Sequence, residues 1–178
     1  MKKILITSLL ALAATTSSFA AVKGGKFGAN FSYSASTPTF GVWWHLTDMI
    51  ALTPSIGWTN KTTTSTGTET NTNEITFGLG LPIYLANFKA LDLFVAPDFA
   101  FTTTSSKTTT AGVSSSTSAS NLAVGAALGL QVQVHDQVHL YGAYTLGYSK
   151  DDPGTTGGTV TTKFGTNRTA IGAIFYFN

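Results

Sequence analysis

Apolar side chains alternate with small or polar ones along run after run of this chain. The last run, residues 171–177, reads Ile-Gly-Ala-Ile-Phe-Tyr-Phe and is followed only by Asn178. Successive side chains of a β-strand point to opposite faces of the sheet, so this alternation predicts strands with one apolar face. We therefore expect an all-β fold, and the central question is whether the apolar face packs inward or faces lipid.

Residues 1–20 have the features of an export signal. Lys2 and Lys3 form a short basic region, residues 4–14 are apolar, and Ser18-Phe19-Ala20 is a small-x-small cleavage site. The apolar stretch is too short to span a bilayer as a helix. We expect cleavage after Ala20, export of the protein, and one mature domain over residues 21–178; the alternative is a buried N-terminal helix.

Charge and cysteine content exclude several classes of protein. Removal of Lys2 and Lys3 lowers the formal net charge from +2 to zero, which argues against a nucleic-acid-binding surface. The chain has no cysteine, which excludes disulfides, thiolate metal sites and a lipid-modified N-terminal cysteine. After the signal, no apolar run is long enough to span a bilayer as a helix, so membrane residence would have to come from strands.

The mature sequence contains eight runs of alternating character, separated by two kinds of connection. The runs are Lys26–Ser36, Thr39–Leu46, Ile50–Trp58, Glu74–Leu85, Leu91–Thr103, Leu122–Val134, Val138–Ser149 and Phe164–Phe177. Short turns at 47–49, 86–90 and 135–137 alternate with long polar connections at 59–73, 104–121 and 150–163; only the connection at 37–38 breaks the rhythm by being brief. This rhythm is typical of an antiparallel up-and-down transmembrane β-barrel of eight strands, with short periplasmic turns, longer external loops and both termini on the periplasmic side.

Threonine and serine dominate two of the long connections, at residues 61–66, 105–110 and 114–120. Such tracts contain too few apolar side chains to order themselves, so we expect flexible, solvated loops. Two alternatives are surface display for adhesion or phage contact, and extension of the strands as β-ribbons beyond the membrane, because threonine favours strands.

The volume of the side chains indicates which face of the sheet is outside. One alternating set holds most of the large apolar residues, including Phe31, Trp44, Phe77 and Leu128, whereas the opposite set is largely glycine, alanine, serine and threonine. The interior of an eight-stranded barrel is only wide enough to be filled by side chains, so the large set must face outward. Some of these residues could form aromatic girdles at the membrane interfaces: Tyr33, Trp44, Trp58, Tyr144, Tyr148, Phe175 and Phe177. The rival fold is a soluble secreted barrel or sandwich that pairs the apolar surplus across two sheets.

At this point the chain resembles the small outer-membrane β-barrel proteins of Gram-negative bacteria, a group that includes the transmembrane domain of outer membrane protein A and the opacity-type surface proteins. The resemblance covers the mature chain. It depends on the hairpin Val42-Trp43-Trp44-His45-Leu46-Thr47-Asp48-Met49-Ile50-Ala51-Leu52, on the eight-strand count, and on a closing strand with alternating Ile171, Ala173, Phe175 and Phe177. That strand is similar to the signal read by the barrel-assembly machinery, although here Asn178 follows the aromatic residue that is normally terminal. The resemblance implies a monomer in the outer membrane, with membrane lipid, lipopolysaccharide and the assembly machinery as partners.

The lumen is expected to differ between its two ends. Large inward residues share one level at the periplasmic end: Trp43, His45, Tyr84, Phe94, His139, Tyr141 and Tyr176. Toward the outside, the inward positions become small, at Ser34, Gly57, Gly78, Gly125 and Gly147. We predict a lumen plugged at the periplasmic end and roomier above, with a ligand pocket above the plug as an alternative to simple packing.

Asp98 and Arg168 are the inward charges that lie well within strands. An unpaired charge in a narrow lumen is costly, so we predict that they form a luminal ion pair. Glu74 and Lys163 lie at outer strand ends and are expected to be solvated.

The sequence offers little for catalysis or for a cofactor. By this topology His45, His135 and His139 all lie at the periplasmic end, far from the outer rim where lipid or peptide substrates would arrive. Asp151 and Asp152 are adjacent carboxylates without a cation-binding pattern. We expect no catalytic residue, no cofactor and no metal site. The expected role is structural work or surface interaction; the alternatives are a narrow channel or small hydrophobic-solute conduit, and an adhesin or phage receptor.

Overall fold

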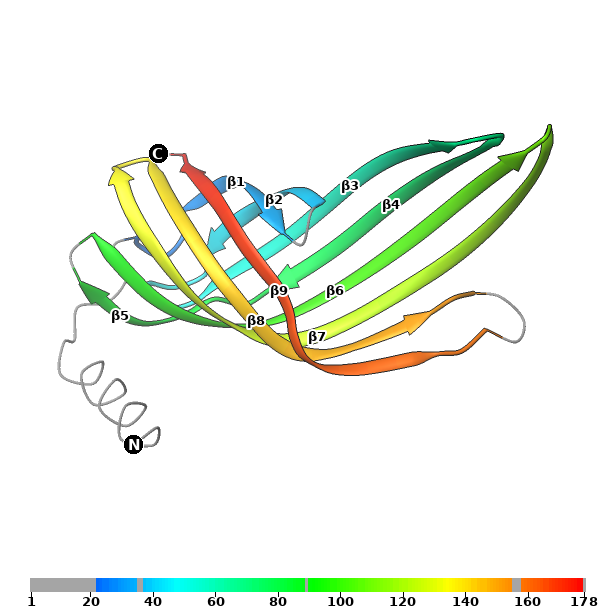
Figure 1. The fold of residues 1–178 in the computed structure, drawn as a ribbon. Coiled ribbons are helices and arrows are strands. Elements are labelled where there is room, and N and C mark those ends of the chain that lie inside the picture. Colours follow the sequence, from blue (N-terminus) through cyan, green and yellow to red (C-terminus); the bar gives the residue numbers. More distant parts are fainter. Residues whose placement is uncertain (1–21, 35–36, 89, 155–157, 178) are drawn as a thin grey trace.

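The computed structural model describes residues 22–34, 37–88, 90–154 and 158–177, and these residues form a single antiparallel sheet (Figure 1). Its strands are β1 Phe27–Ser34, β2 Thr37–His45, β3 Ala51–Ser65, β4 Thr68–Gly80, β5 Ile83–Phe88, β6 Leu91–Thr110, β7 Val113–His135, β8 Val138–Asp152 and β9 Thr161–Tyr176. Neighbouring strands pair in the order β4-β3-β2-β1-β9-β8-β7-β6-β5, and an additional pairing joins β4 to β6. The β4–β6 pairing closes the sheet into a barrel.

The β4 and β5 strands together form one wall strand that is interrupted at Leu81 and Pro82. Pairing with β6 continues without a register shift from Gly80↔Asp98 to Ile83↔Val95 across the interruption. Proline has no N–H to donate to the ladder, which explains the break in the assignment. Counted in this way, the ring has eight strands, and the predicted strand 74–85 is present in two segments. The prediction of an eight-stranded antiparallel barrel is confirmed.

The large apolar side chains lie on the outside of this ring. Phe31, Trp44, Phe77 and Leu128 are about half exposed, and Trp58 is 62% exposed. A closed single sheet cannot bury this surface against a second sheet, so the alternative of a soluble sandwich is wrong. Contiguous apolar surface of this extent is typical of a lipid-facing band.

The three connections at one end are short, and we call this the turn end. They lie between β2 and β3, between β5 and β6, and at Asp136 and Gln137 between β7 and β8. At the opposite end, the β3–β4 and β6–β7 hairpins run well beyond β1 and β2, and the β8–β9 hairpin also extends in that direction (Figure 1). We call that end the ribbon end.

The threonine- and serine-rich connections are ordered strands, so the expectation of flexible loops is wrong and the alternative, extension of the strands as β-ribbons, is the one observed. We call the extension the hydroxyl ribbon; it consists of residues 58–65, 68–75, 103–110 and 113–120 of β3, β4, β6 and β7. Its strands pair in register as far as Ser65↔Thr68, Thr68↔Thr110 and Thr110↔Val113. Hydroxyls bond across the β4–β6 pair, between Thr70 and Thr108 at 3.2 Å and between Thr72 and Ser106 at 3.2 Å. The backbone ladder and these cross-strand bonds replace the apolar core that the tracts lack.

Tight turns end the two hairpins of the hydroxyl ribbon. Gly67 has a φ of 72° between β3 and β4, and between β6 and β7 both Ala111 (φ 49°) and Gly112 (φ 83°) are in the left-handed region. Positive φ at both central residues is the geometry of the hairpin turn that matches strand twist.

The expected export signal at residues 1–20 and the terminal Asn178 lie outside the described residues. In the described part of the chain, no helix is long and apolar enough to cross a membrane.

Candidate functional site

The inward-facing aromatic and histidine residues meet at the turn end of the lumen. We call this set the plug cluster: Trp43 and His45 of β2, Tyr84 of β5, Phe94 of β6, His139 and Tyr141 of β8, and Tyr176 of β9. All of them are almost completely buried except Tyr141, which is half-buried. The structure brings together all seven residues that the sequence placed at this level.

Ring contacts connect the plug cluster across the lumen. The Trp43 ring meets Phe94 edge-on at 5.8 Å between centroids and lies 5.0 Å from Tyr141. His45 stacks on Tyr84 at 5.3 Å. Edge-to-face and offset arrangements of this kind are favoured for aromatic pairs, so the ring contacts stabilise the cluster.

Gln131 of β7 is the polar centre of this end and is fully buried. Its Oε1 accepts a hydrogen bond from the Tyr84 hydroxyl at 2.8 Å, and its Nε2 lies 2.7 Å from His139 Nδ1. The Tyr84 hydroxyl also accepts from Trp43 Nε1 at 3.0 Å, and the Tyr176 hydroxyl lies 2.8 Å from His45 Nε2. Alternation along β7 puts Gln131 on the inward face, but the set of residues predicted to meet at this end does not include it.

Two glycines make room for the plug cluster on neighbouring strands. A Cβ at Gly129 would lie 2.2 Å from the Phe94 ring, and a Cβ at Gly172 would lie 2.6 Å from the Tyr141 ring. Both distances are far below van der Waals contact, so these rings lie directly over glycine backbone. Gly129 and Gly172 therefore leave the space that the large side chains of the adjacent strands, Phe94 and Tyr141, occupy.

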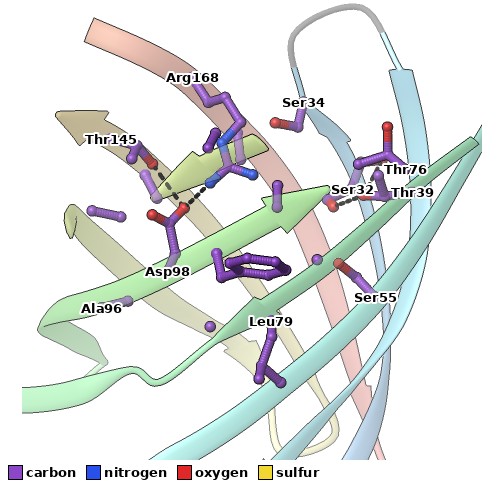
Figure 2. Close-up of a pocket in the computed structure, with 18 of the residues that line it drawn as sticks. Ser32, Ser34, Thr39, Ser55, Thr76, Leu79, Ala96, Asp98, Thr145 and Arg168 are labelled. Carbon is purple, nitrogen blue, oxygen red and sulfur yellow. Dashed lines mark hydrogen bonds and ion pairs between the residues drawn. The ribbon is translucent and has the colours of Figure 1, made fainter. Parts of the chain in front are cut away.

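Above the plug cluster, the lumen opens into a cavity of about 700 Å³, which we call the ribbon-end cavity (Figure 2). Trp43, Phe94 and Tyr141 line it together with residues from the upper strands. The side formed by β1 to β4 contributes seven residues with hydroxyls: Ser32, Ser34, Thr37, Thr39, Thr53, Ser55 and Thr76. All six alanines of the lining belong to β6 to β9: Ala96, Ala100, Ala123, Ala127, Ala143 and Ala170. The β6 to β9 side also carries polar residues, namely Thr102, Asn121, Thr145, Ser149 and Thr166. We therefore call the β1 to β4 side the hydroxyl side and the β6 to β9 side the mixed side.

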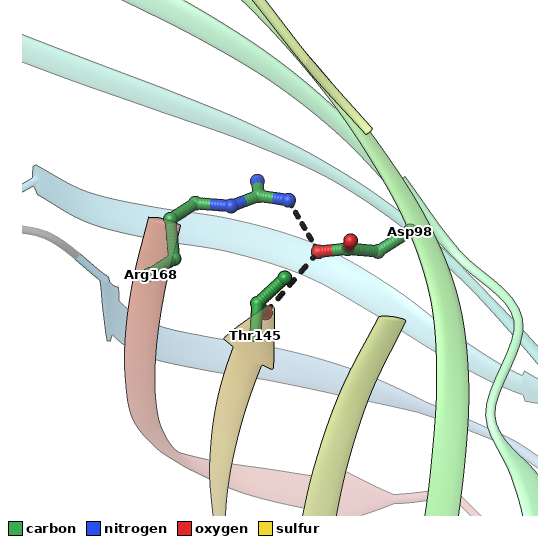
Figure 3. A network of polar contacts seen from close by, with 3 residues as sticks. All are labelled: Asp98, Thr145 and Arg168. Carbon is green, nitrogen blue, oxygen red and sulfur yellow. Dashed lines mark hydrogen bonds and ion pairs between the residues drawn. The ribbon is translucent and has the colours of Figure 1, made fainter. Parts of the chain in front are cut away.

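Asp98 and Arg168 meet on the mixed side of the ribbon-end cavity (Figure 3). Arg168 Nη2 donates to Asp98 Oδ2, and the Thr145 hydroxyl donates to the same oxygen at 3.4 Å. The guanidinium and carboxylate side chains are 21% and 16% exposed. Glycines leave space for the pair, because a Cβ at Gly125 would lie 3.1 Å from Asp98 Oδ1.

Of the two charges expected to be solvated, only one is. Glu74 is half-buried, lines the ribbon-end cavity and accepts a hydrogen bond from Thr37 at 3.0 Å. The Lys163 ammonium lies 3.6 Å from Asp151 with 68% of the lysine side chain exposed. Glu74 differs because β2 begins beside it and supplies a hydroxyl.

His135 is exposed at the β7–β8 turn, whereas His45 and His139 belong to the plug cluster. Over the residues that the structure describes, no three histidine, aspartate or glutamate side chains gather where they could hold a metal ion. Asp151 accepts from Asn121, and Asp152 Oδ1 accepts from the Gly154 N–H at 2.9 Å. These two carboxylates thus take part in local contacts at the β8–β9 connection.

No protein-family model matches this chain, and no curated protein matches its sequence. Solved structures do match its fold. The attachment invasion locus protein of Yersinia pestis matches with a TM-score of 0.54 and 15% identity, over 85% of this chain and 95% of that protein. The same protein in complex with the heparin analogue sucrose octasulfate matches with a TM-score of 0.54 and 14% identity, over 85% of this chain and 94% of that one.

The outer membrane protein OprG from Pseudomonas aeruginosa matches with a TM-score of 0.52 and 11% identity, over 88% of this chain and 97% of that one. A major outer membrane protein from Thermus thermophilus matches with a TM-score of 0.50 and 10% identity, over 85% of this chain and 98% of that one. The resemblance to small outer-membrane barrels is therefore confirmed at the level of the fold.

Proposed function

We propose that this chain is an integral outer-membrane protein that is closed at the turn end and works at the cell surface through the hydroxyl ribbon. The observation that carries the proposal is the four-stranded ribbon of residues 58–65, 68–75, 103–110 and 113–120, which extends the barrel well beyond its apolar band. An ordered, hydroxyl-rich extension suits contact with another surface. The export signal at residues 1–20 and the closing strand of Ile171, Ala173, Phe175 and Phe177 would bring the chain to the outer membrane and to its assembly machinery.

The orientation in the membrane can be tested because the chain has no cysteine. Thr64→Cys places a thiol on the hydroxyl ribbon, and Gln137→Cys places one in the β7–β8 turn. On whole cells, a membrane-impermeant maleimide should label the first variant and not the second. Labelling of Gln137→Cys alone would show that the orientation is opposite to the one proposed. Separately, mass spectrometry of the extracted protein would show whether the mature chain begins at residue 21.

Closure of the lumen is supported by the burial of the plug cluster and by the hydrogen bonds that Gln131 makes to Tyr84 and His139. An opening would have to break these bonds and separate packed rings. In planar lipid bilayers we expect no sustained unitary conductance from the purified protein. Steady single-channel steps would contradict the closed lumen and leave the surface role untouched.

A narrow channel is the second candidate function, because the ribbon-end cavity already occupies much of the lumen, with about 700 Å³ of space. Movement of the plug cluster alone would then open a continuous channel through the lumen. Conductance that appears in Trp43→Ala and is absent from the unaltered protein would show that the plug is what closes the barrel. Conductance in both proteins would favour the channel.

Attachment is the form of surface work that the ribbon favours. This chain is similar to the attachment invasion locus protein in fold alone. The heparin analogue sucrose octasulfate was bound to that protein. The hydroxyl ribbon of this chain carries Lys61 and Lys107 against Glu69 and Glu74, so it lacks the excess of basic residues that a polysulfated ligand would need. Replacing residues 60–73 by a two-residue turn should abolish cell or phage attachment while the protein still shows a heat-dependent gel shift. Unchanged attachment would contradict the role of the ribbon.

A further inference from the structure

The ribbon-end cavity contains buried hydrogen-bonding atoms that the protein itself does not satisfy. Asn30 is 5% exposed and lines the cavity, and its Oδ1 has no partner among the described residues. Asp98 Oδ1 and Arg168 Nε are buried and likewise unpartnered in that part of the chain. Leaving such groups unpaired costs free energy, which a ligand with matching donors and acceptors would recover.

The lining has no excess charge of either sign. Its charged residues are Glu74, Asp98, Lys163 and Arg168, two acidic and two basic, and Asp98 is paired with Arg168. Such a cavity gives little attraction to an anion or a cation, but it presents both an acceptor and a donor at one point. This favours an uncharged ligand that both donates and accepts hydrogen bonds.

The polar walls of the cavity and its aromatic floor favour a ligand with polar edges and an apolar face. Figure 2 shows Ser32, Ser55 and Thr76 on the hydroxyl side, opposite the Asp98–Arg168 pair. The floor is aromatic, with Trp43 and Tyr141 in contact at 5.0 Å. The C–H face of a sugar ring can lie against the electron-rich face of an aromatic ring, while the hydroxyls at its edge bond to polar side chains.

We propose that the ribbon-end cavity binds a neutral, polyhydroxylated molecule of monosaccharide or disaccharide size. Its volume of about 700 Å³ lies within the range of small-molecule sites. Asn30, Asp98 and Arg168 supply the polar contacts, and Trp43 and Tyr141 form the floor. The site shares only Glu74 with the hydroxyl ribbon and does not require the lumen to be closed.

The position of Trp43 provides a direct assay. The chain has three tryptophans, and Trp44 and Trp58 face outward, so the double variant Trp44→Phe/Trp58→Phe leaves Trp43 as the sole tryptophan fluorophore. This protein would be extracted from membranes in detergent, checked for its heat-dependent gel shift, and titrated with glucose and maltose. We expect a saturable change in fluorescence with a dissociation constant on the order of millimolar, as suits a small ligand held by few hydrogen bonds.

Variants in the same background locate the site. Asn30→Ala removes an unpartnered acceptor, and Ala123→Leu fills part of the cavity from its mixed side; each should weaken binding by about tenfold. Asn60→Ala is the matched control, because Asn60 lies on the hydroxyl ribbon outside the cavity lining, and it should not alter binding. If Ala123→Leu fails to fold, Asn30→Ala still decides the question.

Three results would overturn the proposal. The first is the absence of a saturable signal with either neutral sugar. The second is an equal effect of Asn30→Ala and Asn60→Ala, which would place the site elsewhere. The third is binding of glucuronate or glucosamine at least about tenfold tighter than glucose, which would contradict a neutral ligand class.

Discussion

The two ends of the lumen are built from the same strands but from opposite kinds of inward side chain. At the turn end, Trp43, Tyr84 and Tyr176 are large and buried; Trp43 donates to the Tyr84 hydroxyl, and buried Gln131 bonds to both tyrosines. On the hydroxyl ribbon beyond the ribbon-end cavity, side chains are short and carry hydroxyls that bond to the next strand, as between Thr70 and Thr108. Side-chain length therefore decides whether strands are coupled across the lumen or only along the sheet.

This contrast predicts different mechanical roles for the two ends. The plug cluster connects β2, β5, β6, β8 and β9 through one set of contacts, so its loss should lower the stability of the whole barrel. The hydroxyl ribbon has two strand edges without a partner strand among the described residues, β3 beyond Gly57 and β7 before Ser120. Its order depends on local pairing, so it should loosen without unfolding the barrel.

The largest effect is expected from Trp43→Ala. This change removes a buried ring that contacts Phe94 and Tyr141 and donates to the Tyr84 hydroxyl, and it should lower the free energy of unfolding by about 3–5 kcal/mol. Urea unfolding in detergent micelles would measure it. Trp44→Ala is the matched control, since the next residue faces outward at 46% exposure and should cost clearly less. Equal losses for the two variants would mean that the plug cluster does not couple the strands.

Gln131→Leu tests whether the plug cluster depends on its polar centre. The variant keeps the volume but leaves the Tyr84 hydroxyl and His139 Nδ1 without their partner, which should cost about 1–3 kcal/mol in the same assay. Gln133→Leu, two residues further along β7 and half-buried near the turn, should change stability by less than about 0.5 kcal/mol. If Gln131→Leu left the free energy of unfolding unchanged, ring packing alone would account for the stability of the turn end.

The outward face and the plug cluster could be predicted from sequence because strand geometry fixes which face each residue occupies. Trp43 and Trp44 are neighbours in the chain, yet one is buried and the other exposed, as their alternate positions require. The role of Gln131 could not be predicted in the same way. Alternation places it on the inward face, but its contacts with Tyr84 and His139 depend on the register of the strands around the barrel.

For the hydroxyl ribbon, the sequence favoured flexible loops over the alternative of β-ribbons, because threonine and serine tracts have the composition of flexible segments. The sequence nevertheless contained an indication of hairpins. Thr66-Gly67 and Ala111-Gly112 are two-residue turn sequences, and each lies near the middle of its threonine- and serine-rich connection. Threonine at alternate positions on both sides of each turn would then pair across the hairpin. The close approach of Phe94 to Gly129 was beyond prediction, because it depends on the stagger of β6 against β7.

The luminal ion pair should have an effect between those of the two ends. Asp98→Asn removes the charge that Arg168 faces in a partly buried site, and we expect a loss of about 1–3 kcal/mol in the free energy of unfolding. Asp151→Asn breaks the exposed pair with Lys163 and should cost at most about 1 kcal/mol. If Asp98→Asn is as mild as Asp151→Asn, the pair does not help to hold the barrel.

The smallest effect is expected from Thr70→Val on the hydroxyl ribbon, and its size tests whether the ribbon and the barrel are separate units. Thr70 and Thr108 bond at 3.2 Å on the extension, whereas Thr76 and Thr102 bond at 2.9 Å nearer the apolar band. Loss of one cross-strand pair is worth about 0.2–1 kcal/mol. In Thr76→Val that loss should appear in global unfolding, because the strands there open only with the barrel. In Thr70→Val it should appear only as faster amide hydrogen exchange at residues 68–72, with global stability unchanged, since the ribbon opens locally. An equal fall in global stability for both variants would show that ribbon and barrel unfold as one unit, and the proposed independence of the two ends would be wrong.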